Sequence, residues 1–277
     1  MTFKKNIFLQ QIKATARTST LILTAAFSVF AAYAGICYFL AKNHIKQPKL
    51  LAEPCTEETG KELYQPQDPM FIHKANYPDR IRKKEIKYNG FEFDLSKRDG
   101  RLYVAHNTEE ISRNISLSDL LAAVSTPEKH NYWLDMKTVL DDKDIREIKN
   151  TVGKYGIPPS HFFFEPASDD NALALKKEGF SIVFPIFGFG RGEQTPKKTK
   201  VLIAQTEEKL KKIRPNAIAT GIGQYPYLAL YFPHYDKAVY YNTTKRPSLK
   251  KFFLKRFMKK DPKVSIFMTD EYDDIDL

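Results

Sequence analysis

From residue 70 onward, the chain alternates between short apolar, aromatic-rich runs and longer charged segments. Short apolar runs bounded by polar residues are typical of strands buried between other layers of structure. Eight runs are predicted as strands: 70–73, 90–95, 132–136, 162–166, 181–187, 216–220, 238–242 and 264–269. A further short run at 102–106 follows a Lys-Arg-Asp-Gly turn and is predicted to form a hairpin excursion.

The charged segments between these runs have helical spacing. The helices predicted from it are 118–124, 141–156, 169–179 and 207–213. Eight strands separated mostly by helices over roughly 200 residues favour a closed parallel (β/α)8 barrel of the TIM type. An open doubly wound sheet is the alternative, but it usually carries a glycine-rich phosphate loop after its first strand, and FIHKAN has no glycine. GFGRG at 188–192 lacks the dinucleotide-binding spacing and is predicted to be a flexible loop.

The run TLILTAAFSVFAAYAGICYFL, residues 20–40, is uncharged and long enough to cross a bilayer as a helix. Basic residues are slightly more numerous before it than after it, which favours a cytoplasmic N-terminus and an exported main domain. They are Lys4, Lys5, Lys13 and Arg17 before the run, and Lys42, Lys46 and Lys49 after it.

A cleavable signal peptide is the competing interpretation, because Ala32-Tyr33-Ala34 fits a cleavage site. The apolar run continues to Leu40, which favours an uncleaved anchor. The following stretch is polar, contains three prolines and has little periodicity, so it is predicted to be a linker. The expected organisation is a cytoplasmic segment at 1–19, an anchor or signal at 20–41, a linker at 42–68 and a barrel at 69–277.

The composition fits this organisation and narrows the partners. The chain has 277 residues, of which 42% are hydrophobic and 13% aromatic, as expected for a packed globule. The net charge of +11 favours anionic partners such as phosphate esters or acidic lipid headgroups. No nucleic-acid-binding motif is present, so no nucleic acid is expected. The only cysteines, Cys37 and Cys55, are not expected to form a structural disulfide.

Polar side chains stand at the C-terminal ends of the first four predicted strands, where catalytic groups project in such a barrel. Glu92 and Asp94 are two residues apart on one strand and therefore share a face. In chain order the candidates are His73, Glu92, Asp94, His106, Asp135, Lys137 and Glu165. By contrast, Trp133 is expected to face away from Asp135 and to pack in the core.

Carboxylates that converge in a barrel mouth repel one another unless a cation neutralises them. Because Glu92, Asp94 and Asp135 offer only oxygen ligands, Mg²⁺ or Ca²⁺ is favoured over zinc. Two histidines beside such an ion can act as general base and general acid in phosphoryl transfer.

These residues resemble the glycerophosphodiester phosphodiesterase and phospholipase-C-like superfamily of TIM barrels. That group pairs a histidine ending the first strand with Glu-x-Asp on the second, a second histidine in a short insertion and a carboxylate-x-Lys on the third. The matches here are His73, Glu92 with Asp94, His106, and Asp135 with Lys137. The resemblance covers about residues 70–277 and includes VYYNTTKRPSLKKFF and IFMTDEYDD as the last two strand-loop units.

The chain departs from the family's common His-Arg-Gly motif. It has His73-Lys74-Ala75-Asn76 and a shorter first loop. The H-x-x-N form, the short spacing and an aspartate as third ligand look more like the sphingomyelinase-D-like and menorin-like branches. Lys74 in place of the motif arginine also implies a different phosphate-contact geometry.

The resemblance implies a mechanism in which Glu92, Asp94 and Asp135 hold the metal ion. One histidine takes a proton from the attacking hydroxyl, and the other gives a proton to the leaving alcohol. The sequence does not assign the two roles. The residues implied for contact with the substrate or its phosphate are Lys137, Lys74, Asn76 and Glu165. For Asn76 a capping role is the alternative, and for Glu165 a structural role.

Two aromatic segments outside this set have alternative interpretations. Residues 250–260, KKFFLKRFMKK, form either a barrel helix with a solvated basic face or a contact with anionic lipid headgroups. The tyrosine-rich residues 223–235 either line an apolar substrate channel or pack in the core.

The expected function is a membrane-anchored, metal-dependent phosphodiesterase with an exported barrel. Its substrate would be a glycerophosphodiester or a phospholipid, cleaved by hydrolysis. A lyase-type reaction that releases a cyclic phosphate is one alternative. The other is a catalytically inactive barrel that serves as a binding module at the membrane surface.

Overall fold

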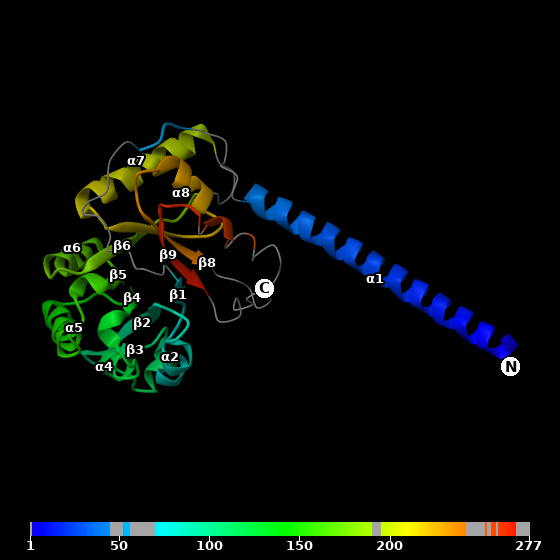
Figure 1. Ribbon diagram of the computed structural model, residues 1–277. Helices are drawn as coiled ribbons and strands as arrows, with labels where there is room; N and C mark the ends of the chain where they lie inside the picture. The colour runs from blue at the N-terminus through cyan, green and yellow to red at the C-terminus, as the bar shows by residue number, and fades with distance from the viewer. Residues whose placement is uncertain are drawn as a thin grey trace.

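Eight parallel strands close into a barrel, seen with its helices in Figure 1. The computed structural model describes residues 2–44, 52–55, 70–189, 195–241, 253, 256–258 and 260–269. Around the barrel the order is β1-β2-β4-β5-β6-β7-β8-β9, and β9 pairs with β1 to complete the ring. The strands are β1 Met70–Ile72, β2 Gly90–Arg98, β4 Asn131–Met136, β5 Phe162–Glu165, β6 Ser181–Pro185, β7 Ala217–Gly221, β8 Lys237–Tyr241 and β9 Val264–Thr269. The predicted TIM-type barrel is confirmed.

The predicted hairpin excursion is also present. Strand β3, Arg101–Val104, runs antiparallel to the extended end of β2, with Leu95 opposite Val104. This hairpin returns the residues after β3 to the middle of β2, where the backbone N–H of Ala105 donates to the carbonyl oxygen of Asp94 at 2.9 Å. The position matters because His106 follows β3 directly.

Helices surround the barrel at nearly all the predicted places. They are α2 Pro78–Lys84, α3 Thr108–Ile111, α4 Leu117–Leu121, α5 Asp142–Lys154, α6 Asp169–Lys177, α7 Pro196–Ile213 and α8 Tyr225–Tyr231, with short 3-10 turns at Pro127–Lys129 and Pro159–His161. Side-chain caps fix several starts, as at Asp141, which accepts hydrogen bonds from the backbone N–H groups of Lys143 and Asp144. Helix α7 begins well before the predicted residue 207, because Thr195 caps it and Pro196 opens it.

The tyrosine-rich segment forms helix α8 and packs. Tyr225, Tyr231 and Tyr235 are buried, and the last two belong to a cluster with residues of α7. Packing is therefore the interpretation that holds for these three side chains. Phe189, near the start of the predicted flexible loop, is fully buried in the same cluster, and residues 190–192 of that loop lie outside the described part.

The interior and exterior faces of the strands have separate cores. Inside the barrel lie Phe71, Trp133, Phe163, Val183, Ala217, Ala219, Ala238, Ile266 and Met268. Outside, a larger cluster joins the strands to the helices and includes Phe91, Phe93, Tyr132, Phe162 and Phe164. Because side chains alternate between faces along a strand, every second residue of β2 points into the barrel. Glu92 and Asp94 therefore face inward, on the same side as Gly90.

Close packing inside the barrel, beside Phe71, requires a glycine at position 90. A Cβ at this position would lie under 3.0 Å from the ring of Phe71. Phe71 in turn packs edge-on against Phe163 at a centroid distance of 5.9 Å, so its ring has little space to yield. We expect Gly90→Ala to lower the free energy of unfolding by roughly 1–3 kcal/mol, as for other overpacked cores.

Denaturant unfolding of the full chain would measure this loss. Gly153→Ala in α5 is the matched control, because its Cβ would meet nothing within 4 Å. We expect the control to stabilise the protein by roughly 0.5–1 kcal/mol, through helix propensity. Equal effects of the two substitutions would contradict the proposed crowding at Gly90.

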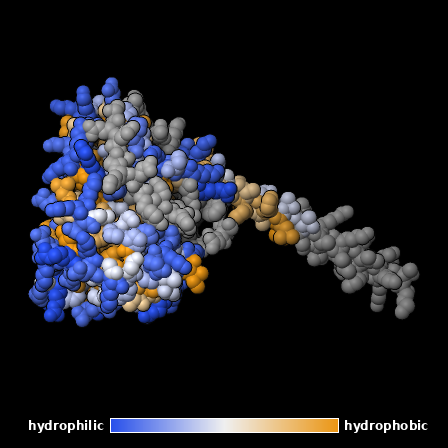
Figure 2. All heavy atoms as spheres, turned by 60° about the vertical axis from the view of Figure 1, so that its left-hand side comes forward, coloured by the Kyte–Doolittle hydropathy of each residue, from blue (hydrophilic) through white to orange (hydrophobic). Residues whose placement is uncertain are grey.

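Helix α1, Thr2–His44, projects from the barrel (Figure 1). Within it, Ile22–Asn43 has a mean hydropathy of 1.8 and is only 6% buried. By length and composition it can cross a membrane, a test that an N-terminal signal sequence also passes. Figure 2 shows the apolar side chains of this helix beside the largely hydrophilic barrel surface.

Part of the predicted linker lies against the barrel. The backbone N–H of Cys55 donates to the carbonyl oxygen of Tyr231 at 2.7 Å, and Cys55 is buried in the cluster between α7 and α8. Cys37 and Cys55 are both buried, and neither forms a disulfide among the described residues. Residues 45–51 and 56–69 of the linker lie outside the described part, as do residues 242–252 and 270–277 of the last two predicted strand-loop units.

Candidate active site

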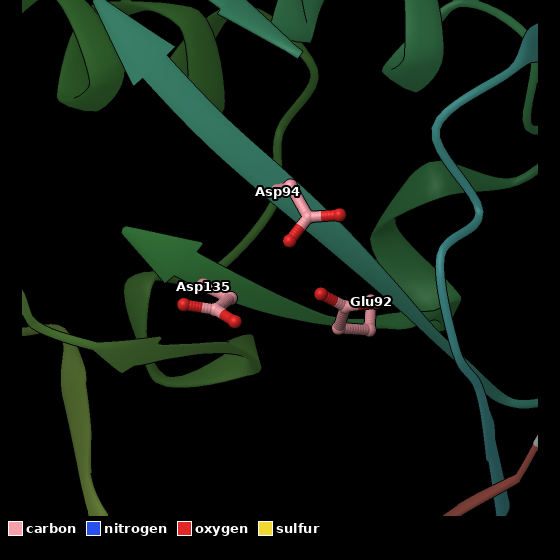
Figure 3. Close-up of side chains that lie close together, drawn as sticks. All are labelled: Glu92, Asp94 and Asp135. Carbon is pink, nitrogen blue, oxygen red and sulfur yellow. The ribbon is translucent and has the colours of Figure 1, made fainter. Parts of the chain in front are cut away.

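Three carboxylates meet at the carboxyl end of neighbouring strands (Figure 3). Asp94 on β2 is in register with Asp135 on β4, and Glu92 lies one inward position below Asp94. One oxygen from each carboxylate lies within 4.8 Å of the others. Glu92 and Asp94 are each 1% exposed, whereas Asp135 is half-buried. The pairing of β2 with β4 thus brings together residues that are about 40 positions apart in the chain.

The loop after β1 is built around two of these carboxylates. The Asn76 side-chain amide donates to Asp94 Oδ2 at 2.8 Å, and Asn76 Oδ1 accepts from the Asp94 backbone N–H at 3.0 Å. The backbone N–H of Lys74, in the left-handed region at φ 54°, donates to the Glu92 carboxylate. The H-x-x-N sequence therefore orients the acidic cluster, with the Lys74 backbone and the Asn76 side chain as the contacting groups.

The two histidines each stand beside a different carboxylate. His106 Nδ1 is 3.1 Å from Asp94 Oδ1, and His73 Nε2 is 3.9 Å from Glu92 Oε2. The side chain of His106 is 41% exposed and that of His73 is 21% exposed. Both rings thus border the cluster, and both are partly exposed on its open side, where a substrate could reach them.

Lys137 completes the set from the end of β4. Its Nζ is 3.0 Å from Asp94 Oδ1 and also contacts Asp135 Oδ2. Burial by itself would lower the pKa of Lys137, but Asp135 and Asp94 outweigh it and raise the pKa. Lys137 is therefore a fixed positive charge beside the carboxylates.

The electrostatics of the cluster fit a divalent cation. Burial, and then the nearby Asp94 charge, raise the pKa of Glu92 well above its usual range. Burial acts in the same direction on Asp94, but Lys137, His106 and Asn76 overcome it and lower the pKa of that carboxyl. Three carboxylates with a single lysine leave an excess of negative charge in a buried place. A hard cation with oxygen ligands, such as Mg²⁺ or Ca²⁺, balances that excess.

Glu165 forms the next wall of the site. It ends β5 in register with Asp135. Burial, and then the Asp135 charge, raise the pKa of Glu165 to about 8. The Lys137 charge, and after it Trp133, lower the pKa of Glu165 and partly offset this rise. The prediction that Trp133 faces away from Asp135 was wrong: it points into the barrel, since residues two apart on a strand share a face.

Tyr240 is the residue of this region that the sequence did not indicate. Its ring packs edge-on against Trp133 at 5.2 Å, and its hydroxyl is buried without a hydrogen-bond partner among the described residues. It lies two residues after the inward-facing Ala238 on β8. Strand alternation could have identified its inward direction, but nothing in the sequence placed β8 opposite Trp133.

The raised pKa of Glu165 predicts a pH-dependent stability. The folded protein keeps this carboxyl protonated up to about pH 8, whereas the unfolded chain ionises near 4.5. The folded state therefore binds more protons in this window, and stability falls as pH rises through it, by at most about 1.4 kcal/mol per pH unit from this group. We expect Glu165→Gln to reduce the slope of melting temperature against pH in metal-free protein. An unchanged slope would contradict the assignment.

Asn76→Ala is expected to weaken metal binding without removing a ligand. Loss of its two hydrogen bonds frees Asp94 to rotate, and losing such supporting contacts typically costs about 10–100-fold in metal affinity. Calorimetric titration with Mg²⁺ or Ca²⁺ would measure it. Asn171→Ala is the matched control, because Asn171 is also buried and makes two hydrogen bonds of 2.8 Å, both to the Leu140 backbone. Equal affinity losses in both variants would refute the positioning role.

Comparison with known proteins adds information on the fold. No protein-family model matches the sequence, and no match is found among curated proteins. A structure assigned as a glycerophosphodiester phosphodiesterase from Galdieria sulphuraria aligns over 77% of this chain and 96% of its own, with 13% identity and a TM-score of 0.50.

Two further structures align less well. A glycerophosphodiester phosphodiesterase from Parabacteroides distasonis covers 73% of this chain and 93% of its own, at 11% identity and a TM-score of 0.45. A phosphoribosyl anthranilate isomerase from Thermococcus kodakaraensis covers 73% and 87%, at 14% identity and a TM-score of 0.44. At these identities the likeness establishes the fold alone, and the chain is a TIM barrel.

Proposed function

We propose that the protein is a metal-dependent phosphodiesterase. The observation that carries this proposal is the acidic cluster of Glu92, Asp94 and Asp135, with His73 beside one carboxylate and His106 beside another. Displacement at phosphorus needs one group to accept a proton and one to donate a proton. The two histidine rings, each beside a different carboxylate, can supply these two groups.

The cation would be held by Glu92, Asp94 and Asp135. Bound there, Mg²⁺ or Ca²⁺ supplies charge neutralisation and polarisation of the phosphoryl oxygens. Asn76 and the Lys74 backbone keep two of the three carboxylates in place. Lys137 adds a positive charge that stabilises negative charge developing on the phosphoryl group.

The two histidines divide the proton transfers. One ring nitrogen takes the proton of the attacking hydroxyl, which belongs either to water or to the substrate itself. The other ring delivers a proton to the oxygen of the departing alcohol as the phosphorus–oxygen bond breaks. His106 already directs Nδ1 at Asp94, so its Nε2 is the nitrogen left for the substrate.

The substrate class we propose is a glycerol- or lipid-linked phosphodiester. The structural neighbour from Galdieria sulphuraria, assigned as a glycerophosphodiester phosphodiesterase, supports this choice. Within that class, the H-x-x-N loop and the aspartate at the third ligand position favour a relation to the sphingomyelinase-D-like and menorin-like branches. The clamp of Asn76 on Asp94 gives that loop a physical role.

We further propose that α1 anchors the protein, with residues 1–19 in the cytoplasm, 20–41 in the membrane and the barrel at 69–277 exported. The support is the apolar span and the small excess of basic residues before it. A reporter fused to the C-terminus reveals the compartment in which the barrel lies. We expect its activity outside the cytoplasm. Activity confined to the cytoplasm would reverse this topology.

The catalytic proposal is tested on the full chain in detergent. The protein would be incubated with glycerophosphodiesters, lysophospholipids and sphingomyelin, in Mg²⁺, in Ca²⁺ and in chelator, with products identified by phosphorus NMR. Cleavage that depends on the metal supports the proposal, and a phosphomonoester product identifies hydrolysis. A cyclic phosphate would identify a lyase-type reaction. No turnover across the panel would favour the binding-module alternative.

A further inference from the structure

The C-terminal end of α1 packs directly against the barrel. Tyr38 lies with its ring 5.3 Å from those of Phe253 and Phe257, edge-on to the first. Ala41 is fully buried and belongs to the main core cluster together with Met258. These barrel residues lie in the connection between β8 and β9, so the helix is joined to the barrel by side-chain packing as well as by the chain.

The same end of α1 keeps an apolar face exposed. Cys37 and Ala41, four residues apart, are buried against the barrel side. Ile36, Phe39 and Leu40 are 58%, 62% and 47% exposed. One face of the helix therefore meets the protein while the other presents large apolar side chains, which is the arrangement of a membrane helix that still touches its own domain.

Helix geometry fixes the depth of this contact. Lys42 is the first charged residue after the apolar run. A lysine at the end of a membrane span lies at the depth of the lipid headgroups. Tyr38 is four residues earlier, about 6 Å along the axis at 1.5 Å per residue. The rings of Phe253 and Phe257 that touch Tyr38 therefore reach the boundary between the headgroups and the acyl chains.

Basic side chains accompany these rings. Arg256 and Lys260 are four residues apart and exposed, and Lys42 at the end of the span is exposed as well. Aromatic rings and exposed cations on one segment are the combination that binds an interfacial segment to an anionic membrane surface.

We infer that the segment carrying Phe253, Arg256, Phe257 and Lys260 lies in the headgroup layer of the membrane that α1 crosses and binds anionic lipid headgroups. The inference rests on the proposed membrane anchoring and not on the proposed catalysis. It places one side of the barrel against the bilayer, through the packing of Tyr38 on Phe253 and Phe257.

The depth is tested by fluorescence in vesicles that contain the full-length protein. Trp133, the only native tryptophan, is fully buried inside the barrel and serves as an internal reference. Phe257→Trp adds a reporter at the predicted boundary. We expect lipids brominated near the carbonyl end of the acyl chain to quench it more strongly than lipids brominated near the methyl end. Leu173→Trp on α6 is the matched control, because Leu173 is 39% exposed. Brominated lipids should quench this variant no more than they quench the native protein.

The charge preference is tested with the same reporter. Bromines on phosphatidylglycerol should quench more than bromines on phosphatidylcholine at equal mole fraction, since each basic residue near the surface favours anionic lipid by about fivefold at low salt. Arg256→Glu with Lys260→Glu should abolish the preference. Lys143→Glu with Arg146→Glu on α5 is the matched control and should retain it.

Three results would overturn the inference. Quenching of Phe257→Trp no stronger than that of Leu173→Trp would remove the segment from the membrane. Equal quenching by the two headgroups would remove the anionic specificity. Failure of the protein to float with the vesicles would refute the anchoring and the inference together. None of these readouts uses turnover, so they leave the proposed catalysis to its own test.

Discussion

Replacing either His73 or His106 with alanine is expected to lower kcat by about 10²–10⁴-fold, the usual contribution of a positioned acid or base. The two rings stand beside different carboxylates, at 3.9 Å from Glu92 and 3.1 Å from Asp94, so neither can substitute for the other. Because both act in one displacement, the double variant should be little worse than the more damaged single variant.

Steady-state kinetics on the best substrate of the panel would measure these losses, with folding checked by thermal melting. His161→Ala and His234→Ala are the matched controls. His161 binds the carbonyl oxygen of His130 at 3.2 Å and precedes β5, at the end of the barrel away from the site, and His234 is exposed in the loop after α8. Near-normal kcat in both the His73 and His106 variants would eliminate two-histidine catalysis.

Removing the cation or one of its proposed ligands should have an effect of similar size. Chelation is expected to abolish turnover, and Asp135→Asn is expected to weaken metal affinity by more than about 100-fold, beyond the loss typical of a supporting residue. Asparagine keeps the size of the side chain, but it removes a negative charge from a cluster whose oxygens lie within 4.8 Å. Lys137 would then compete more effectively for Asp94, which it already contacts at 3.0 Å.

A thermal shift gives a readout that does not depend on activity. Metal at a hundred times its dissociation constant should stabilise the native protein by about 2.7 kcal/mol. The shift should be smaller at low pH, because protons compete for Glu92, whose pKa is raised by burial. Asp135→Asn should lose most of the shift, while the exposed Asp142→Asn control on α5 should keep it. Full turnover by the metal-free protein would disprove the metal dependence.

The barrel could be predicted from the sequence because each strand repeats the same local pattern. An apolar run such as FFFEP or VSIFMT is too short for a core helix and is bounded by polar or turn residues. The helices were harder to delimit. Helix α7 was predicted only from residue 207 because its first half, PKKTKVLIAQT, has a weak periodicity, and its start depends on the Thr195 cap.

The candidate residues could also be identified from the sequence, since a parallel barrel gathers the carboxyl ends of its strands at one edge. What the sequence could not supply is the contact between them. Register puts Asp94 opposite Asp135, and burial is what raises the pKa of Glu92 and Glu165. Neither register nor desolvation can be read from residues that are distant along the chain.

Local composition and spacing were therefore enough to predict the number and order of the strands, the apolar N-terminal span and the acidic and histidine side chains of the site. Three contacts became visible only in the folded chain: Asn76 holds Asp94, Tyr240 packs against Trp133 inside the barrel, and α1 packs on the barrel through Tyr38. Each of these contacts joins residues that are far apart in the chain, so local composition and spacing carry no signal for it.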